Sequence, residues 1–112
     1  MHIGIYLARL EETPPAESKI FTDVERRYCL DRRYPGPHLA GRYAAKRATC
    51  SALALAPDTD LSEIEVRRER GRAPTIALRG EPARAARRLG AGEFHVSISH
   101  SGDYAVAFVV SE

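Results

Sequence analysis

The chain has 112 residues, of which 44% are hydrophobic and 29% charged, and its formal net charge is +2. A chain of this size and composition is expected to form one globular domain, residues 1–112, around a single modest core. No apolar run is long enough to span a membrane, and the N-terminus lacks the basic and apolar segments of a signal peptide. We therefore expect a cytoplasmic protein that has no membrane partner.

Arginine supplies nearly all of the 17 basic residues and clusters at residues 67–72 and 84–88. Such clusters can contact nucleic acid, an acidic protein or the phosphates of a cofactor. No aromatic residues interleave them and no nucleic-acid motif is present, so we expect no nucleic-acid partner; a solvated surface is the main competing interpretation. Cys29 and Cys50 lie too far apart in sequence for a metal or redox pair, which favours structural roles.

The first half of the chain predicts a strand followed by two helices. Hydrophobic residues alternate from His2 to Leu10, which favours a strand. Beyond Pro14-Pro15, the apolar spacing from Ala16 to Arg33 is helical. Residues 35–37, Pro-Gly-Pro, predict a loop, and a second helix is expected from His38 to Leu55.

The second half predicts two strand pairs with one short helix between them. Short apolar runs bounded by Gly, Pro and Asp favour hairpins. This mixed order of elements predicts the α+β class, with a small antiparallel sheet packed against helices. The expected elements are strands Leu61–Arg68 and Thr75–Leu78, a helix Glu81–Leu89, and strands Phe94–Ser99 and Tyr104–Ser111, the last two joined by a turn at residues 100–103.

Three short motifs occur in a characteristic order. Residues 4–7 read Gly-Ile-Tyr-Leu, residues 42–48 read Arg-Tyr-Ala-Ala-Lys-Arg-Ala, and residues 96–101 read Val-Ser-Ile-Ser-His-Ser. Together with the order of elements, they resemble the holo-acyl-carrier-protein synthases, which are 4'-phosphopantetheinyl transferases. The resemblance implies the phosphopantetheinyl-transferase-like fold and a homotrimer with active sites between neighbouring subunits. It also implies an enzyme that moves phosphopantetheine from coenzyme A (CoA) to a serine of an acyl carrier protein.

The resemblance breaks at the positions that hold the metal ion. The family pattern has Asp in the place of Tyr6 and Glu in the place of Arg47, and these carboxylates bind magnesium. A guanidinium cannot bind a hard cation that takes oxygen ligands, and its charge repels that cation. We therefore expect no metal site, no required cofactor and loss of the metal-dependent phosphoryl chemistry. Ser51 also replaces a lysine that contacts CoA phosphates in the family.

The residues that keep or replace the family's site define a candidate pocket. Tyr43, Arg47 and Ser51 follow one another at four-residue spacing and therefore share a helical face. The resemblance places Tyr6 and His100 in the same cleft. Such a set can bind an anion or polarise a carbonyl, with His100 as acid or base. The candidate catalytic residues are Tyr6, Arg47 and His100, and the candidate residues for binding CoA or a pantetheine arm are Arg42, Tyr43, Lys46 and Ser51.

The sequence leaves three functions open. The favoured one is a repurposed family member that acts on, or binds, acyl substrates linked to an acyl carrier protein through pantetheine, in biosynthetic metabolism. The second is a non-catalytic protein that binds a carrier protein through its arginines. The third is a true phosphopantetheinyl transferase with displaced metal ligands. The alternative is that these residues have structural roles only: Tyr6 fills space and Arg47 pairs with a nearby carboxylate.

Overall fold

The computed structural model describes residues 1–69 and 71–112; Arg70, part of the first arginine cluster, lies outside the described residues. The order of helices and strands confirms the predicted α+β class. Among the described residues, no helix combines the length and apolar character that a membrane span needs. The elements are β1 (His2–Arg9), η1 (Leu10–Glu12), α1 (Asp23–Leu30), α2 (Pro35–Ala52), η2 (Leu61–Glu63), β2 (Ile64–Arg67), β3 (Thr75–Leu78), α3 (Gly80–Leu89), β4 (Phe94–Ser101) and β5 (Tyr104–Ser111), where η marks a 3₁₀ turn.

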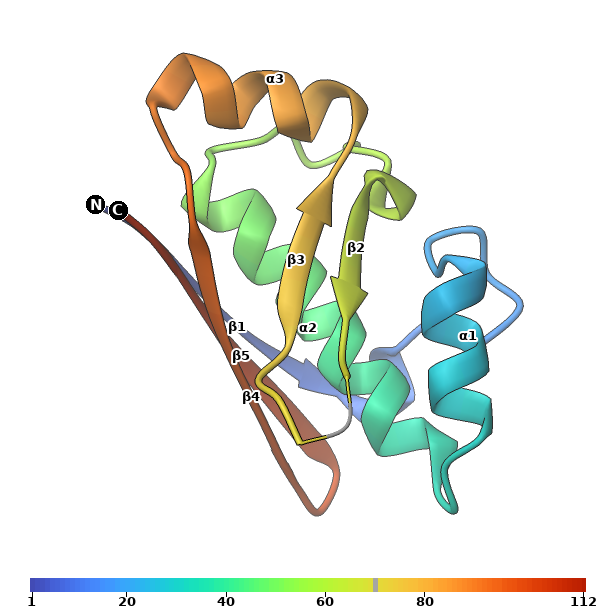
Figure 1. The fold of residues 1–112 in the computed structure, drawn as a ribbon. Coiled ribbons are helices and arrows are strands. Elements are labelled where there is room, and N and C mark those ends of the chain that lie inside the picture. Colours follow the sequence, from blue (N-terminus) through green and yellow to red (C-terminus); the bar gives the residue numbers. More distant parts are fainter. Residues whose placement is uncertain (70) are drawn as a thin grey trace.

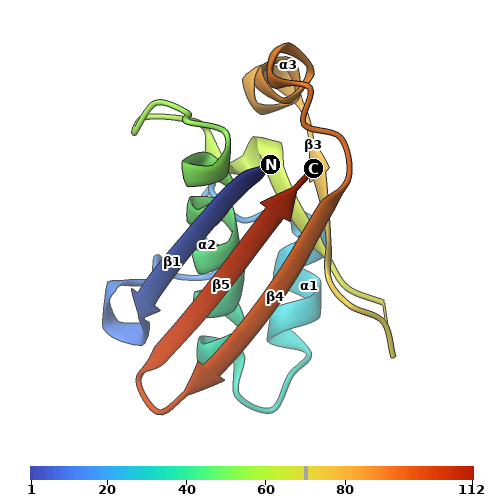
Figure 2. The ribbon, with the colours of Figure 1, turned by 90° about the vertical axis from the view of Figure 1, so that its left-hand side faces the viewer.

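The strands form two antiparallel sheets, one of β1, β5 and β4 in that order and one of β2 and β3. Helix α2 runs through the middle of the molecule, with the three-stranded sheet on one side and β2, β3 and α1 around its other sides (Figure 1). Figure 2 shows the three-stranded sheet with α2 behind it. The chain ends lie together because β1 begins opposite the end of β5.

Small side chains let α2 approach the three-stranded sheet closely. Ala44, Ala45 and Ala48 of this helix are fully buried against it. A Cβ atom on Gly4 of β1 would lie 1.8 Å from the carbonyl oxygen of Ala48. Only a glycine fits at this crossing, so it fixes the distance between α2 and the strand that carries Tyr6.

The predicted helix boundaries in the first half were partly wrong. The helix expected from Ala16 to Arg33 is confined to α1, because Thr22 caps its N-terminus in a reciprocal capping box with Glu25. The loop expected at Pro35 is instead the first turn of α2. Proline is compatible with that turn because its missing N–H would have no intrahelical partner there.

The second half agrees more closely with the prediction, except around the two hairpins. The expected strand from Leu61 to Arg68 begins with η2 before β2. Strand β4 continues through His100 and Ser101, so His100 lies in a strand and the turn consists only of Gly102-Asp103. Gly102 has a φ of +57°, a backbone conformation that glycine adopts without strain.

We expect Gly4→Ala to destabilise the protein strongly. The added methyl group must push α2 away from β1, and overpacking of this kind costs about 1–3 kcal/mol or more. The free energy of unfolding in urea measures the loss. Gly92→Ala is the matched control, because a Cβ atom there meets no atom within 4 Å. Equal stability of the two variants would show that the helix–strand contact tolerates the methyl group.

Candidate functional site

Three of the predicted site residues meet between β1 and α2, and we call them the phenol–guanidinium cluster: Tyr6, Tyr43 and Arg47. The two phenol rings pack edge to face, with centroids 5.9 Å apart. Arg47 Nε donates a hydrogen bond to Tyr43 Oη at 3.2 Å, and the guanidinium carbon lies 5.4 Å from the Tyr43 ring centroid. The spacing of Tyr43 and Arg47 in sequence therefore predicted a real contact on α2.

The cluster carries a positive charge that is not neutralised within it. Burial, and then the neighbouring Tyr43, raises the pKa of Tyr6 above its ordinary value of 10, so Tyr6 is a neutral O–H donor near pH 7. The hydrogen bond to Tyr43 raises the pKa of Arg47, so this guanidinium stays charged. The cluster thus offers N–H and O–H donors to an anion or to a polarised carbonyl oxygen.

These residues do not fit a magnesium ion. The family's carboxylate positions hold a phenol and a guanidinium, and hard divalent cations prefer carboxylate, carbonyl and water oxygens. Within residues 1–69 and 71–112, no three His, Cys, Asp or Glu side chains gather closely enough to hold a metal ion.

His100 lines a cavity of about 240 Å³, which we call the histidine pocket. The rings of His38 and His100 pack edge to face, with centroids 5.3 Å apart, and His38 packs in the same way on Tyr28 at 6.0 Å. This cavity brings together α1, α2, β4 and the segment that follows β2. It is lined by Tyr28, Pro37, His38, Gly41, Arg42, Arg68, Ile98 and His100.

Arg42 is the most unusual side chain of the histidine pocket. It is only 3% exposed, and its guanidinium lies 4.2 Å from the centroid of the Tyr28 ring. Its Nε and Nη2 atoms are buried, and they have no hydrogen-bond partner among residues 1–69 and 71–112. A buried charged donor without an acceptor destabilises the folded state unless water or an anion accepts its hydrogen bonds. Arg42 is therefore suited to contact a ligand in this cavity.

The structure divides the predicted catalytic set into two groups. Ile98, Tyr6 and Tyr43 each pack against the same buried core cluster, and Ile98 also lines the histidine pocket. No hydrogen bond or ring contact joins His100 to Tyr6 or Arg47 in the described part of the chain. In a single chain, His100 is therefore a neighbour of Arg42 rather than of the phenol–guanidinium cluster.

Lys46, predicted to bind a cofactor, is instead fully buried in the core. Its Nζ atom lies 2.8 Å from Glu25 Oε1 and donates to the carbonyl oxygens of Leu61 and Ile64 at 2.9 and 2.6 Å. An ammonium has three donors, so none is left for a ligand. Ser51, also predicted to bind a cofactor, is exposed near the end of α2.

Sequence reasoning missed three residues of the histidine pocket: Tyr28, His38 and Arg68. A signal existed for His38, because it precedes Arg42 by four residues and so shares its helical face. Nothing local marked Tyr28 or Arg68, which reach the cavity only through the packing of α1 and the end of β2 against α2.

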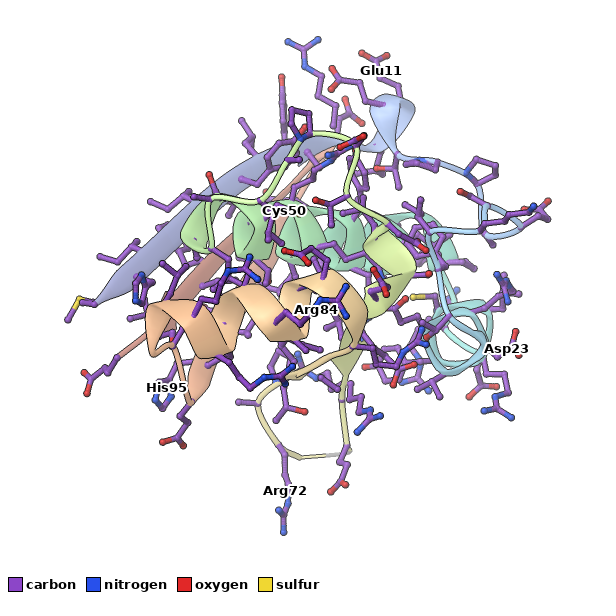
Figure 3. The ribbon with its side chains drawn as sticks, turned by 90° about the horizontal axis from the view of Figure 1, so that it is seen from above. Glu11, Asp23, Cys50, Arg72, Arg84 and His95 are labelled. Atoms are coloured by element: carbon purple, nitrogen blue, oxygen red, sulfur yellow. The ribbon has the colours of Figure 1, made fainter. Side chains whose placement is uncertain are left out.

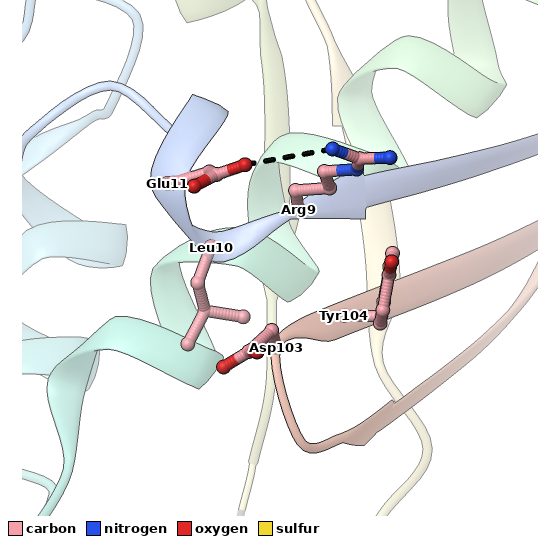
Figure 4. Close-up of a pocket in the computed structure, with 5 residues that line it drawn as sticks. All are labelled: Arg9, Leu10, Glu11, Asp103 and Tyr104. Atoms are coloured by element: carbon pink, nitrogen blue, oxygen red, sulfur yellow. Dashed lines mark ion pairs between the residues drawn. The ribbon is translucent and has the colours of Figure 1, made fainter.

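A further cavity of about 330 Å³ lies where β1 ends beside the β4–β5 turn (Figure 4). Arg9 pairs with Glu11 at 3.5 Å and stacks on Tyr104 at 5.9 Å from the ring centroid. Leu10 and Asp103 complete its lining, and none of the predicted site residues is among them.

Comparison with known proteins assigns the family. A holo-[acyl-carrier-protein] synthase of Moorella thermoacetica is 39% identical over 96% of this chain and 88% of its own length. The chain belongs to the holo-acyl-carrier-protein synthase family. No family model matches it.

Solved structures of synthases confirm the fold. The ACPS–CoA complex of Chronobacterium ammoniagenes superposes with a TM-score of 0.84 at 31% identity, covering 98% of this chain and 95% of that one. A holo-(acyl-carrier-protein) synthase of Bacillus anthracis in complex with CoA (3',5'-ADP) gives a TM-score of 0.77 at 28% identity, covering 98% and 94%. The phosphopantetheinyl-transferase-like fold predicted from three motifs is therefore confirmed.

We expect Lys46→Met to cost about 3–5 kcal/mol of unfolding free energy, because it leaves the Glu25 carboxylate buried without its counter-charge. The double variant Glu25→Gln/Lys46→Met should lose less than the sum of the two single variants. Urea unfolding measures all three. The control is Glu69→Gln, which breaks an exposed pair with Arg72 and should change stability by less than about 0.5 kcal/mol. If Lys46→Met is as mild as the control, the pair is not a structural requirement.

Proposed function

We propose that this member of the synthase family binds pantetheine-bearing ligands, CoA or the arm of an acyl carrier protein, without magnesium and acts on the acyl group that the arm carries. The observation that carries the proposal is the phenol–guanidinium cluster. It places a fixed cation, Arg47, at a position where the family pattern has a metal-binding carboxylate. The family itself supports an acyl carrier protein as the partner, because the curated relatives are named for that substrate.

The phenol–guanidinium cluster is suited to acyl chemistry. The Tyr6 O–H and the Arg47 N–H groups are donors in one cluster, and donors are what an acyl carbonyl oxygen requires when it gains negative charge. The neutral phenol adds a hydrogen bond, and the guanidinium adds charge that a metal ion would otherwise supply. These two residues are therefore assigned to the acyl carbonyl, with Tyr43 holding Arg47 in place at 3.2 Å.

The histidine pocket is suited to the phosphate end of the same ligand. Arg42 has two buried donors to offer, and Arg68 and His100 line the same cavity. Phosphate oxygens accept hydrogen bonds from a guanidinium fork with matching geometry. In this assignment His100 binds the phosphate-bearing end. It could act as acid or base at the phenol–guanidinium cluster only from a neighbouring subunit, because the two sites do not meet in one chain.

Two further functions stay open. Identity of 36–39% to synthases over nearly the whole chain favours phosphopantetheinyl transfer with metal ligands from elsewhere. Exposed arginines such as Arg72, which projects from the β2–β3 turn in Figure 3, favour non-catalytic binding of an acidic carrier protein.

Intact-mass spectrometry of an apo carrier protein incubated with this protein and CoA is the primary test. We expect no phosphopantetheine addition with or without Mg²⁺, while a known synthase modifies the same carrier. The variant Tyr6→Asp/Arg47→Glu restores two carboxylates and should gain Mg²⁺-dependent addition. Addition by the unmodified protein would overturn the proposal and favour the transferase.

Acyl-loaded carrier proteins then distinguish catalysis from binding. If the phenol–guanidinium cluster is catalytic, Arg47→Met should lower turnover of the acyl group by about 10²–10³-fold while carrier binding persists. Unchanged acyl groups in all reactions, together with carrier binding, would favour the non-catalytic function.

We also propose that the protein is a homo-oligomer, and the family resemblance specifies a trimer. The outer face of the three-stranded sheet exposes Ile3, Ile5 and Leu7 of β1 and Phe108 of β5, each with about half of its surface in water. Adjacent exposed apolar residues of this kind typically mark an interface. The face lies opposite α2, so its burial leaves the helix packing unchanged.

The sheet face can be tested with Leu7→Lys, which places a charge among apolar side chains. We expect it to shift the mass measured by light scattering from the oligomer to the monomer. Leu30→Lys on α1 is matched in exposure, 55% against 58% for Leu7, and should leave the mass unchanged. A monomeric unmodified protein, or an oligomer that survives Leu7→Lys, would contradict this assignment.

A further inference from the structure

As far as the structure describes the chain, the lining of the histidine pocket contains titratable and cationic groups but no carboxylate. Arg42, Arg68, His38 and His100 converge on it, and Arg42 has two buried donors without a partner. The neighbouring cavity, which shares Tyr28 and Arg68, adds Arg32 and a single carboxylate, Asp31. Four groups of one sign around a small cavity repel one another unless an anion lies between them or some of them stay neutral.

We propose that the histidine pocket binds a phosphate monoester and that His38 takes up a proton when it does, so that binding strengthens as the pH falls. This inference rests on the proposed function, because it specifies how the phosphate end of a CoA-like ligand is held. It adds a residue, His38, and a proton linkage that the assignment of Arg42 and His100 does not contain.

The surroundings of His38 explain why it is the group that switches. Arg42 lies one turn further along α2, His100 packs on its ring from β4, and Arg68 follows β2. Tyr28 of α1 contacts the His38 ring, and the Arg32 guanidinium stacks on the Tyr28 ring at 4.7 Å from its centroid. In the described part of the chain, the charged or titratable groups that line the cavity with His38 are arginines, His100 and Tyr28, and the nearby Asp31 carboxylate is paired with Arg32 at 3.1 Å.

These neighbours keep His38 neutral near pH 7. Burial lowers the pKa of His38 below 6.5, and Arg42, His100, Arg32 and Arg68 lower it further. A phosphate dianion in the cavity reverses the effect of those charges, because its negative charge favours imidazolium and accepts the new N–H bond. Protonation and anion binding therefore stabilise each other.

Linkage fixes the sign of two measurable effects. Without anion, the folded state holds fewer protons at His38 than the unfolded state, so stability falls as the pH drops below about 6.5. A bound dianion raises the pKa of His38 and removes this loss. Affinity for the dianion must then rise over the same pH range, by roughly tenfold for each pKa unit that binding adds.

Two anionic probes distinguish proton uptake by the protein from protonation of the ligand. Sulfate stays a dianion throughout the range and so reports only protons taken up by the protein. The second probe is 3',5'-ADP, which carries two phosphate monoesters. NMR titration of the imidazole resonances follows the four histidines of the chain individually, with and without each anion.

We expect saturation with either anion to raise the pKa of His38 by at least about one unit, and sulfate to bind roughly tenfold more tightly at pH 5.5 than at pH 8. His38→Phe keeps an aromatic ring against Tyr28 and His100, so it should bind at pH 8 and lose the tightening at pH 5.5. His95→Gln is the control, because His95 is exposed on β4 outside this cavity (Figure 3) and should behave as the unmodified protein.

The pH dependence of anion binding and the activity on acyl carriers are measured independently, so either one can fail alone. If His38→Phe retains the full pH dependence, or only the His100 resonance shifts, the proton does not reside on His38 and the inference is overturned. The same holds if neither anion binds at any pH. Activity on acyl carriers decides the proposed function separately, and proton-linked anion binding can hold even if no acyl group is turned over.

Discussion

The buried ion pair between Glu25 and Lys46 is the interaction on which the remaining structure depends. Glu25 Oε1 lies beside the ammonium and accepts from the Thr22 N–H that begins α1, while Oε2 accepts from the Val66 N–H of β2. Lys46 in turn holds carbonyl oxygens on either side of the entry into β2. One pair of charges thus joins two helices and a strand, and each charge is solvated by backbone groups instead of water.

This arrangement gives α2 its two functional faces. Lys46 is directed into the core, and the alanines of α2 pack on the sheet. The larger side chains of α2 therefore lie on its remaining faces. Arg42 turns toward α1 and His100, while Tyr43 and Arg47 turn toward Tyr6. One helix therefore directs donors to two separate groups of side chains, the phenol–guanidinium cluster and the histidine pocket.

The sequence predicted the class, most strands and the helical contact between Tyr43 and Arg47, because these depend on local spacing and on motifs. The prediction of a helix was wrong for Ala16–Thr22, because the cap at Thr22 overrides the helical apolar pattern of this segment. It also placed Lys46 in the ligand site. The sequence of a motif does not show whether its lysine binds phosphate or a buried carboxylate. The partner of Lys46 is Glu25, which lies 21 positions earlier in the chain. Only tertiary packing distinguishes those cases, and the same packing brings Tyr28 and Arg68 to His38.

A guanidinium and a metal ion differ in the chemistry that they can support. A divalent ion bridges several phosphate oxygens and exchanges with solvent, whereas Arg47 has one charge, a fixed attachment and directional N–H donors. Its contact with Tyr43 also limits where those donors point. Such a group is poorly suited to neutralising a transferring phosphoryl group but well suited to one developing oxyanion. Buried guanidinium donors of the kind suited to phosphate lie instead on Arg42, in the histidine pocket. The division favours a protein that still holds the phosphate end of its ligand while directing chemistry to the acyl end.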